Sequence, residues 1–400
     1  GCGSLTSITI PAKVTSIGYM AFNGCTALAG VYISDMNAWC KIDFSYTNTN
    51  NPLYYAKNLY LNNQLVTELT LTDAVIAGNT LKGYKKLTTL TINGNSTVES
   101  SAFAGCTGLT SVNIGGTTSL KGYVFEGCTA LKTVTISDNV ADLGESTFDG
   151  CKALTSVTFS GKVTEIKKST FSGCTGLTSI TLPSGVTSIG QSAFYRCTGL
   201  KDITVSDSVT SIGQSAFDGC TGLENVMLGK SVESIGQSAF SDCTGLKNVT
   251  IPSSLTTVND FAFNRSSIVN LRISSLEAWC KIVFGASGSN PLSGATNFYL
   301  DGDPVTDLVL PAAVTTIKGN TFRGFKGFTS VTIGDNVTVQ SYAFEGCTGL
   351  TSVTIPDNVA DIGEYVFSGC TGLTSAAITA GITEIKKGMY EGCTGLTTLT

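Results

Sequence analysis

The cysteines are the residues of this chain whose type and spacing could carry chemistry. Most of the 14 cysteines recur every 22 or 23 residues, in one run from Cys106 to Cys243 and another from Cys347 to Cys393. A zinc site would use C-x-x-C pairs or histidine partners, and the sequence contains neither. A disulfide needs Cβ atoms about 3.5–4.5 Å apart with a perpendicular twist, and stacked equivalent residues do not present that geometry. We therefore predict columns of small, buried free thiols, with no metal and no cofactor.

Two further cysteines, Cys40 and Cys280, lie out of phase and each follows a tryptophan. We predict that both are buried core residues. The absence of histidine also excludes a Ser-His-Asp or Cys-His catalytic arrangement. A β-helix glycosidase or lyase could still use two carboxylates, but the carboxylates of this chain are scattered and do not gather in one column of neighbouring repeats.

The cysteine period belongs to a repeat of the whole sequence. A fixed period between 20 and 50 residues is typical of a solenoid, in which each repeat buries its apolar face against its neighbours. In the repeat at 174–196, an L-x-x-I-x-L pattern predicts a strand over residues 177–182. Pro183 ends this strand because it cannot donate to the ladder. A shorter apolar segment at 186–189 follows, so each coil has a long strand and a short strand or turn.

The strand pattern recurs along the chain from Leu5 to Leu396. We predict a β-dominated solenoid, a right-handed superhelix of about 17 coils with a parallel sheet on one face. The array would form one continuous body over residues 1–400. Leucine, isoleucine, valine, phenylalanine and cysteine columns should fill its core.

Two segments, 33–86 and 273–325, break the period and match each other. Each contains Ala-Trp-Cys-Lys-Ile, then Asn-Pro-Leu, then an Asn-x-Tyr-Leu strand. A unit of roughly 240 residues is therefore itself duplicated. The end of each segment predicts a β-hairpin, turning at Asn62-Asn63 in the first and at Asp301-Gly302 in the second.

The composition limits the classes of function. The chain is 42% hydrophobic but only 13% charged, with a net charge of −5. A mildly acidic chain with dispersed lysine and arginine is a poor nucleic-acid binder. No apolar run is long enough for membrane insertion, and the first residues do not form a signal peptide. Both ends fall inside a repeat, so we expect a fragment of a longer protein, with any signal or anchor outside it.

Residues 178–194 read T-S-I-T-L-P-S-G-V-T-S-I-G-Q-S-A-F. This segment resembles the BspA-like family of leucine-rich repeats, whose consensus is near L-T-x-I-x-I-P-x-x-V-x-x-I-G-x-x-A-F-x-G-C. The resemblance covers essentially the whole chain and weakens at 119–123. It implies a leucine-rich-repeat fold and a secreted or cell-surface protein of a host-associated microbe. It also implies binding or adhesion toward host matrix, other cells or immune receptors.

The outward positions of the strands are mostly serine and threonine. Such columns would suit an ice-binding surface, but β-propensity and hydration also account for them. One stretch departs from this pattern and forms a varied candidate contact patch, with side chains Lys201, Asp202, Glu224, Asn225, Met227, Lys247, Asn248, Asn270 and Arg272. The alternative is an exposed ion ladder of little energetic value beside tolerated asparagines.

Trp39 and Trp279 are the other candidate contact residues, because tyrosines lie near them in the sequence and aromatic side chains on a protruding element can anchor a partner. The alternative is that both pack over the solenoid and cover its core. From the resemblance and this exposed face, we expect a non-enzymatic surface protein that binds a host or neighbouring-cell protein or glycan. A structural spacer and a carbohydrate-active β-helix enzyme remain as alternatives.

Overall fold

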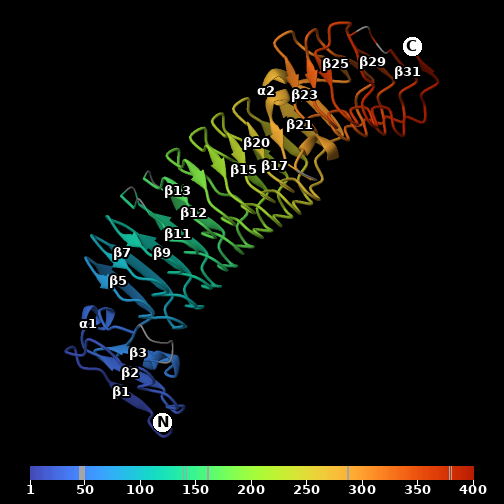
Figure 1. The fold of residues 1–400 in the computed structure, drawn as a ribbon. Helices are drawn as coiled ribbons and strands as arrows, with labels where there is room; N and C mark the ends of the chain where they lie inside the picture. The colour runs from blue at the N-terminus through green and yellow to red at the C-terminus, as the bar shows by residue number, and fades with distance from the viewer. Residues whose placement is uncertain are drawn as a thin grey trace. The chain divides into compact units, whose positions relative to one another are not determined.

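The computed structural model describes residues 1–44, 50–137, 139–140, 142–159, 162–285, 288–377, 379 and 381–400. It is a parallel β-solenoid of about 17 turns (Figure 1). The chain divides into two compact units, a first unit of Gly1–Lys201 and a second unit of Asp202–Thr400. The predicted fold class is confirmed, and the expectation of one continuous body over residues 1–400 stays a prediction.

Most coils of the first unit contribute a longer strand, and most contribute a two-residue strand to a separate sheet. The longer strands form two sheets. The first contains β1 (Ser7–Thr9), β2 (Gly30–Ile33) and β3 (Asn58–Leu61), with the two-residue hairpin strand β4 (Gln64–Leu65), and the second contains β5 (Glu68–Thr72), β7 (Thr89–Asn93), β9 (Ser111–Ile114), β11 (Thr133–Ile136) and β12 (Ser156–Phe159). The short strands are β6 (Val75–Ile76), β8 (Thr97–Val98), β10 (Ser119–Leu120), β13 (Glu165–Ile166) and β14 (Ser188–Ile189). Successive strands pair in parallel in the order of the chain, for example β7 with β9 and β9 with β11.

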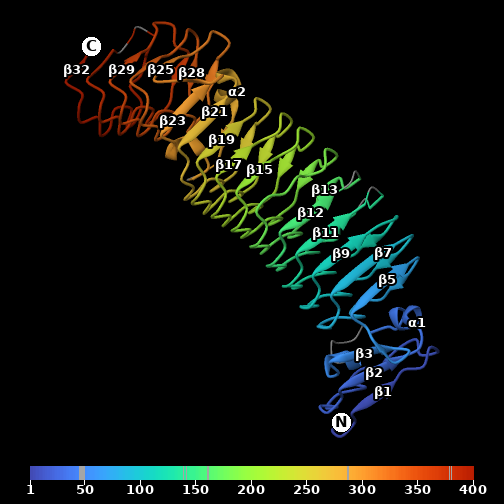
Figure 2. The same cartoon turned by 180° about the vertical axis from the view of Figure 1, so that it is seen from behind.

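The second unit repeats this plan, and Figure 2 shows its strands from behind. Its sheet with the longer strands contains β15 (Asp202–Thr204), β17 (Asn225–Met227), β19 (Asn248–Ile251), β21 (Asn270–Ile273), β23 (Asn297–Leu300) and β24 (Asp303–Pro304), and a further sheet contains β25 (Asp307–Val309), β27 (Ser330–Thr332), β29 (Ser352–Thr354), β31 (Ser375–Ala376) and β32 (Thr398–Leu399). The short strands are β16 (Ser211–Ile212), β18 (Ser234–Ile235), β20 (Thr257–Val258), β22 (Val283–Phe284), β26 (Thr316–Ile317), β28 (Thr338–Val339) and β30 (Asp361–Ile362).

The structure has no regular strand over residues 177–182, where the sequence predicts one. Its inward residues Ile180 and Leu182 are nevertheless buried, so the segment keeps its place in the core. Pro183 has no amide hydrogen and ends the segment. One of the interstrand bonds that remains is donated by the Lys201 amide to the Thr178 carbonyl oxygen, 3.1 Å away.

The core consists of columns of identical residues, as the repeat predicts. Buried and exposed residues alternate along β11, and the inward leucine, isoleucine, valine, phenylalanine and cysteine side chains are almost completely buried. Phenylalanines of successive coils form stacks in both units. Phe125 lies between Phe103 and Phe148, with ring centroids 5.7 and 5.6 Å apart and interplanar angles of 16° and 5°. These offset stacks add to the area that the rings bury.

The cysteine columns are buried free thiols, as predicted. In most coils of the runs, the cysteine Sγ lies 3.0–3.3 Å from the carbonyl oxygen of a phenylalanine in the preceding coil. Cys174, for example, donates to the Phe148 carbonyl at 3.2 Å. Cys40 and Cys280 are buried as well. The cysteines therefore pack the turn after each phenylalanine and join one coil to the next.

Thiol labelling under native conditions should reveal this difference in exposure. Cys2 is exposed and Cys393 is half-buried, whereas the other twelve cysteines are buried. A maleimide at neutral pH should modify Cys2 rapidly and Cys393 slowly, and the rest only after unfolding, because reaction needs access and the thiolate form. Intact-protein mass spectrometry counts the modified thiols. A C2S variant should lose the fast phase, and labelling of Cys174 at the rate of Cys2 would contradict the structure.

The two irregular segments contain the helices that the structure describes. In the first segment these are α1 (Met36–Cys40) and the 3-10 helix η2 (Pro52–Tyr54), and in the second they are α2 (Leu276–Lys281) and η3 (Pro291–Gly294). Within the described residues, no helix has the length and apolar character that crossing a membrane requires. Both predicted hairpins are confirmed.

The hairpin turns use residues that tolerate left-handed backbone conformations. β3 pairs antiparallel with β4 around Asn62 and Asn63, whose φ angles are 51° and 66°. β23 pairs with β24 around Asp301 and Gly302, with φ angles of 49° and 95°. Asparagine, aspartate and glycine are the residues that accept positive φ at both central positions of a two-residue turn. β3 and β23 also continue the parallel sheets of β2 and β21.

Candidate recognition face and the duplicated pockets

The side chains of Asp202 and of the three asparagines in the predicted contact patch form a continuous row of hydrogen bonds on the second unit. Asn297, which was not predicted, extends this row. The strands β15, β17, β19, β21 and β23 place Asp202, Asn225, Asn248, Asn270 and Asn297 in register. Each asparagine donates its Nδ2–H to the Oδ1 of the residue before it, at 2.5, 2.7, 2.8 and 2.9 Å in chain order. We call these five residues the amide ladder.

The amide ladder leaves hydrogen-bonding capacity for a ligand. An asparagine side chain has two N–H donors and a carbonyl oxygen with two lone pairs. Each bond along the ladder uses one donor and one lone pair of an inner residue, so a second N–H and a second lone pair remain. Asp202 and Asn225 are exposed, and Asn248, Asn270 and Asn297 are half-buried. The ladder also fixes the side-chain rotamers, which lowers the entropy that a bound partner would have to remove.

A second row of side chains lies two residues further along the same strands. The register aligns Met227, Thr250, Arg272 and Tyr299. Met227 is 57% exposed. The guanidinium of Arg272 lies over the Tyr299 ring, 4.4 Å from its centroid, a cation–π contact that holds the arginine flat against the sheet. The amide ladder and this row together define the recognition face.

The charged residues that flank the face contribute less. Lys247 lies 3.6 Å from Glu224, and both side chains are largely exposed. An exposed pair of this kind contributes about 0–1 kcal/mol to stability. Lys201 is exposed and is the last residue of the first unit, so the face defined on the second unit does not include it.

Beyond the second hairpin the same strand position carries a carboxylate. Asp307, at the start of β25, accepts hydrogen bonds from Ser330 Oγ at 2.5 Å and from Thr329 Oγ1 at 2.6 Å. These two bonds hold the pKa of the Asp307 carboxyl below its usual value. The amides therefore end at the hairpin, and a hydroxyl-bonded carboxylate follows them.

The tryptophan candidates do not lie on a surface. Trp39 and Trp279 are each 1% exposed. The ring centroid of Trp39 lies 5.3 Å from that of Phe44, and the centroid of Trp279 lies 5.2 Å from that of Phe284 and 5.8 Å from that of Phe298. Helices α1 and α2 turn the indoles inward, where they cover the core. The packing alternative therefore fits the structure, and we leave both residues out of the contact set.

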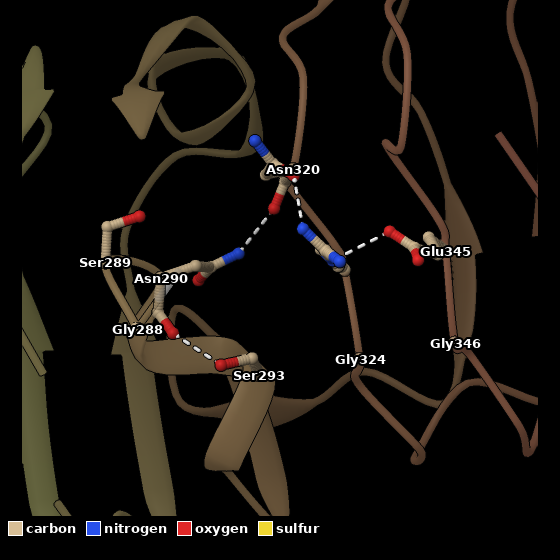
Figure 3. A pocket seen from close by; sticks show the side chains of 9 residues that line it. Gly288, Ser289, Asn290, Ser293, Asn320, Gly324, Glu345 and Gly346 are labelled. Carbon is tan, nitrogen blue, oxygen red and sulfur yellow. Dashed lines mark hydrogen bonds and ion pairs between the residues drawn. The ribbon is translucent and has the colours of Figure 1, made fainter. Parts of the chain in front are cut away.

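A pair of equivalent pockets, which we did not predict from the sequence, lies beside the two 3-10 helices. In the second unit, the Asn290 side chain caps η3 by accepting from the Leu292 amide at 2.8 Å, and its Nδ2 donates to the carbonyls of Asn320 and Thr321 at 2.7 and 2.9 Å (Figure 3). A cavity of about 310 Å³ lies beside this contact, and its lining includes Ser293 and Arg323. We call it the second-unit pocket.

The first unit has the same arrangement. Asn51 caps η2, and its Nδ2 donates to the carbonyls of Asn79 and Thr80 at 3.0 and 2.9 Å. A cavity of about 390 Å³, the first-unit pocket, lies beside it, and its lining includes Tyr54 and Lys82. The repeated Asn-Pro-Leu sequence was the available signal for both pockets. What it could not reveal is that η2 and η3 pack against the turns of the following coils.

The side chains of these sites are mostly hydrogen-bonding and charged groups. Within the described part of the chain, no group of three or more histidine, cysteine, aspartate or glutamate residues is arranged to hold a metal ion. The recognition face presents amides, a methionine, an arginine and a tyrosine, and the pockets present hydroxyl groups, basic side chains and backbone groups. These groups suit hydrogen bonding and ion pairing to a partner.

Comparisons with known proteins agree with this architecture. A crystallised leucine-rich repeat protein from Bacteroides ovatus is 27% identical, with a TM-score of 0.52 over 73% of this chain and 76% of that chain. A leucine rich cell surface protein from Faecalibacterium prausnitzii is 21% identical, with a TM-score of 0.32 over 84% and 83% of the two chains. Among curated proteins, none matches significantly.

The family comparison covers most of the sequence. The model of the BspA type leucine-rich repeat region matches residues 1–51, 74–184, 164–289 and 294–400. The repeat, the parallel strands and the buried columns are thus shared with a defined group of proteins, and the chain belongs to the BspA-type leucine-rich repeat family.

Proposed function

We propose that this chain is a non-enzymatic recognition protein that binds a protein partner through the recognition face of the second unit. The observation that carries the proposal is the amide ladder from Asp202 to Asn297, with Arg272 held over Tyr299 beside it. A row of pre-ordered amides can pair with the peptide groups of a partner, while Met227, the first residue of the second row, offers apolar contact. Arginine and tyrosine are enriched among the residues that dominate binding energy at protein interfaces.

Family membership supports this proposal, since leucine-rich repeat proteins typically bind proteins. It also supports an extracellular or cell-surface location, with a host or neighbouring-cell protein as the ligand. A glycan ligand is an alternative that the same screen would detect. An enzyme of the carbohydrate-active type would need two carboxyl groups facing each other, whereas the described part of the recognition face carries one carboxylate at the end of a row of amides.

A spacer that projects another domain is the second candidate, and the first unit provides the observation in its favour. The outward side chains of β9, β11 and β12 begin with Ser111, Thr133 and Ser156. A surface rich in hydroxyl groups is well hydrated and offers few varied contacts. The two functions are compatible, because the first unit can extend the array while the second unit binds.

The experiment is a binding screen of the purified chain against extracellular matrix proteins and a glycan array, followed by a triple variant of the face. N225A and N248A interrupt the amide ladder, and R272E reverses the charge of the stacked arginine. We expect the affinity for the partner found in the screen to fall at least about tenfold. The variant should keep its circular dichroism spectrum, since all three side chains lie on the outer face of the sheet.

A charge-matched control separates the face from a general electrostatic effect. The variant S352A, T354A and K230E removes two outward hydroxyls and reverses one exposed charge elsewhere in the same unit. It should bind as tightly as the original protein. Equal losses in the two variants, or a screen with no partner at all, would count against the recognition face, and the second result would favour the spacer.

A further inference from the structure

The two duplicated pockets share a scaffold but not a chemistry. Asn51 and Asn290 make the same pair of backbone contacts, and Gly83 and Gly324 occupy matching turns with φ angles of 75° and 77°. The side chains that face the two cavities differ. The two copies of one architecture therefore differ in their surface chemistry.

In the second-unit pocket, the positive charge of the basic residue is paired with a carboxylate. Arg323 is its basic residue, and Arg323 Nε lies 2.8 Å from Glu345 Oε2. Arg323 also donates from Nη1 to Asn320 Oδ1 at 3.3 Å. Figure 3 shows Glu345 and Asn320 on the two sides of this part of the cavity. The arginine is therefore already compensated by residues of its own unit.

The first-unit pocket lacks this compensation. Lys82 takes the place of Arg323, and the position that matches Glu345 is Ala104. Within the residues that the structure describes, Lys82 has no ion pair. The acidic residue that lines this cavity is Glu126, which lies two coils beyond Lys82. The basic side chain is thus available to an anionic ligand.

A second cavity adjoins the first-unit pocket and adds more positive charge. Its volume is about 420 Å³, and its lining includes Lys57, Lys85 and Lys86. All three lysines are exposed, and none forms an ion pair in the described part of the first unit. In the second unit, threonine and glycine stand at the positions that match Lys57 and Lys86. Four lysines therefore surround one site in a chain whose net charge is −5.

An exposed tyrosine stands between the two cavities. Tyr54 lines both of them and is 58% exposed, while serine occupies the matching position 293. The ring of Tyr54 meets that of Tyr55 edge to face, with centroids 5.0 Å apart and an angle of 80°. Tyr55 is itself held in place, since its hydroxyl donates to Asn23 Oδ1 at 3.2 Å and accepts from the Gly24 amide at 3.3 Å. Tyr54 is therefore an exposed aromatic ring that Tyr55 supports on one side.

We propose that the paired cavities around Tyr54 form a binding site for an acidic saccharide, with a sugar ring on the Tyr54 ring and its carboxylate or sulfate groups on Lys57, Lys82, Lys85 and Lys86. Cavities of this size fall in the range of small-molecule sites. A pyranose ring has an apolar C–H face that packs on an aromatic ring and polar edges that reach adjacent groups. Lysine, as a flexible point charge, accommodates carboxylate and sulfate geometries alike.

This site lies in the first unit and does not depend on the recognition face. Four lysines around one tyrosine are too few to follow a nucleic-acid backbone, which binding proteins neutralise over many phosphates. An acidic peptide would satisfy the lysines but would leave the tyrosine without the C–H face that a sugar supplies. Acidic peptide binding is therefore an outcome that the test must distinguish.

The test measures binding by isothermal titration calorimetry with four probes. A tetragalacturonate represents carboxylated saccharides, a heparin-derived tetrasaccharide represents sulfated ones, maltotetraose is the neutral control, and tetraglutamate is the acidic peptide. We expect one or both acidic saccharides to bind, with an affinity that falls as salt is added, because the lysine contacts are exposed to screening. Which of the two binds identifies the acidic group. Equal binding of tetraglutamate, or of maltotetraose, would overturn the assignment.

The residues at the matching positions of the second unit define the substitutions that test the site. Y54S, and the pair K57T and K86G, convert the first-unit site to the residues of its counterpart, and all of these side chains are exposed. Each variant should lower saccharide affinity at least about tenfold, whereas Y54F should bind like the original protein because it keeps the ring. The control pair K230T and K326G removes the same charge from the second unit and should have no effect. Loss of affinity in the control pair, or full affinity in Y54S, would contradict the proposal.

Discussion

Replacing Phe125 by alanine is expected to lower the free energy of unfolding of the first unit by about 3–5 kcal/mol, the usual cost of such a truncation in a core. Phe125 is completely buried and stacks on both sides, against Phe103 and Phe148. The truncation leaves a cavity and also removes two stacked contacts, each worth about 0.5–1.5 kcal/mol beyond the area that the ring buries. Urea denaturation followed by circular dichroism measures the change.

The matched control for this experiment is T135A. Thr135 is an exposed, outward-facing residue of β11. Its replacement should change stability only through β-propensity, a scale that spans about 1 kcal/mol. Because each coil of a solenoid contacts mainly its neighbours, a destabilised coil in the middle of the unit should also reduce the cooperativity of unfolding. A loss for F125A no larger than that for T135A would mean that the phenylalanine stacks do not carry the stability of the core.

Alkaline pH is expected to unfold the protein, because the cysteine columns cannot ionise in place. Burial raises the pKa of the Cys128 and Cys197 thiols from the usual 9.0 to about 12. The same cause raises the pKa of Cys243 to about 12 in the second unit, and it raises the pKa of Cys174 well above the usual value. The folded protein therefore holds neutral thiols at a pH where the unfolded chain holds thiolates.

The sign of the effect follows from this difference. Below pH about 9 the thiols are protonated in both states, and their contribution to stability is fully present. As the pH rises from about 9 toward 12, the unfolded state loses protons first, and each such thiol removes about 1.4 kcal/mol of stability per pH unit. Several thiols acting together exceed the typical stability of about 5–15 kcal/mol within roughly two pH units. Circular dichroism and thiolate absorbance should change in one transition.

A variant of the column identifies the cysteines as the cause. Replacing Cys128, Cys151 and Cys174 by alanine will lower stability at neutral pH, since each change leaves a small cavity, but the dependence of stability on pH should become shallower. The experiment is done with a reducing agent present, so that oxidation does not contribute. If the slope above pH 9 were the same in both proteins, ionisation of tyrosine or lysine would have to explain the alkaline transition.

The parts of the fold that repeat were predictable from the sequence, and the parts that depend on side-chain rotamers were not. The hairpin at Asn62 and Asn63 was predictable because these residues tolerate positive φ. The columns of the core were predictable because a period places equivalent residues in equivalent environments. The amide ladder was not, since the sequence locates Asn225 and Asn248 in one column but does not indicate that their side chains bond to each other. Residue type alone did not decide between the two roles considered for Trp39, and the structure shows that this tryptophan is buried.

The pockets were beyond the sequence for a different reason. Tyr54 and Lys82 are separated by 28 positions, and only the packing of η2 against the following coil brings them to one cavity. At the strand expected over residues 177–182, burial was predictable but strand formation was not. Its burial follows from the repeat, whereas its hydrogen bonds depend on the backbone of its neighbours.

The two irregular segments also affect the register in which the coils stack. A stack of near-identical coils is ambiguous under a shift of one repeat, because phenylalanine would again meet phenylalanine and each thiol would again find a carbonyl. Asn51 breaks this translational symmetry, since it belongs to an irregular segment and its side-chain amide donates to the carbonyls of Asn79 and Thr80. We expect the two irregular segments to act as markers that help to assign each strand its partner during folding. Ordinary repeats can be gained or lost between such markers with every column intact, so the length of the array is free to drift in evolution while its register is kept.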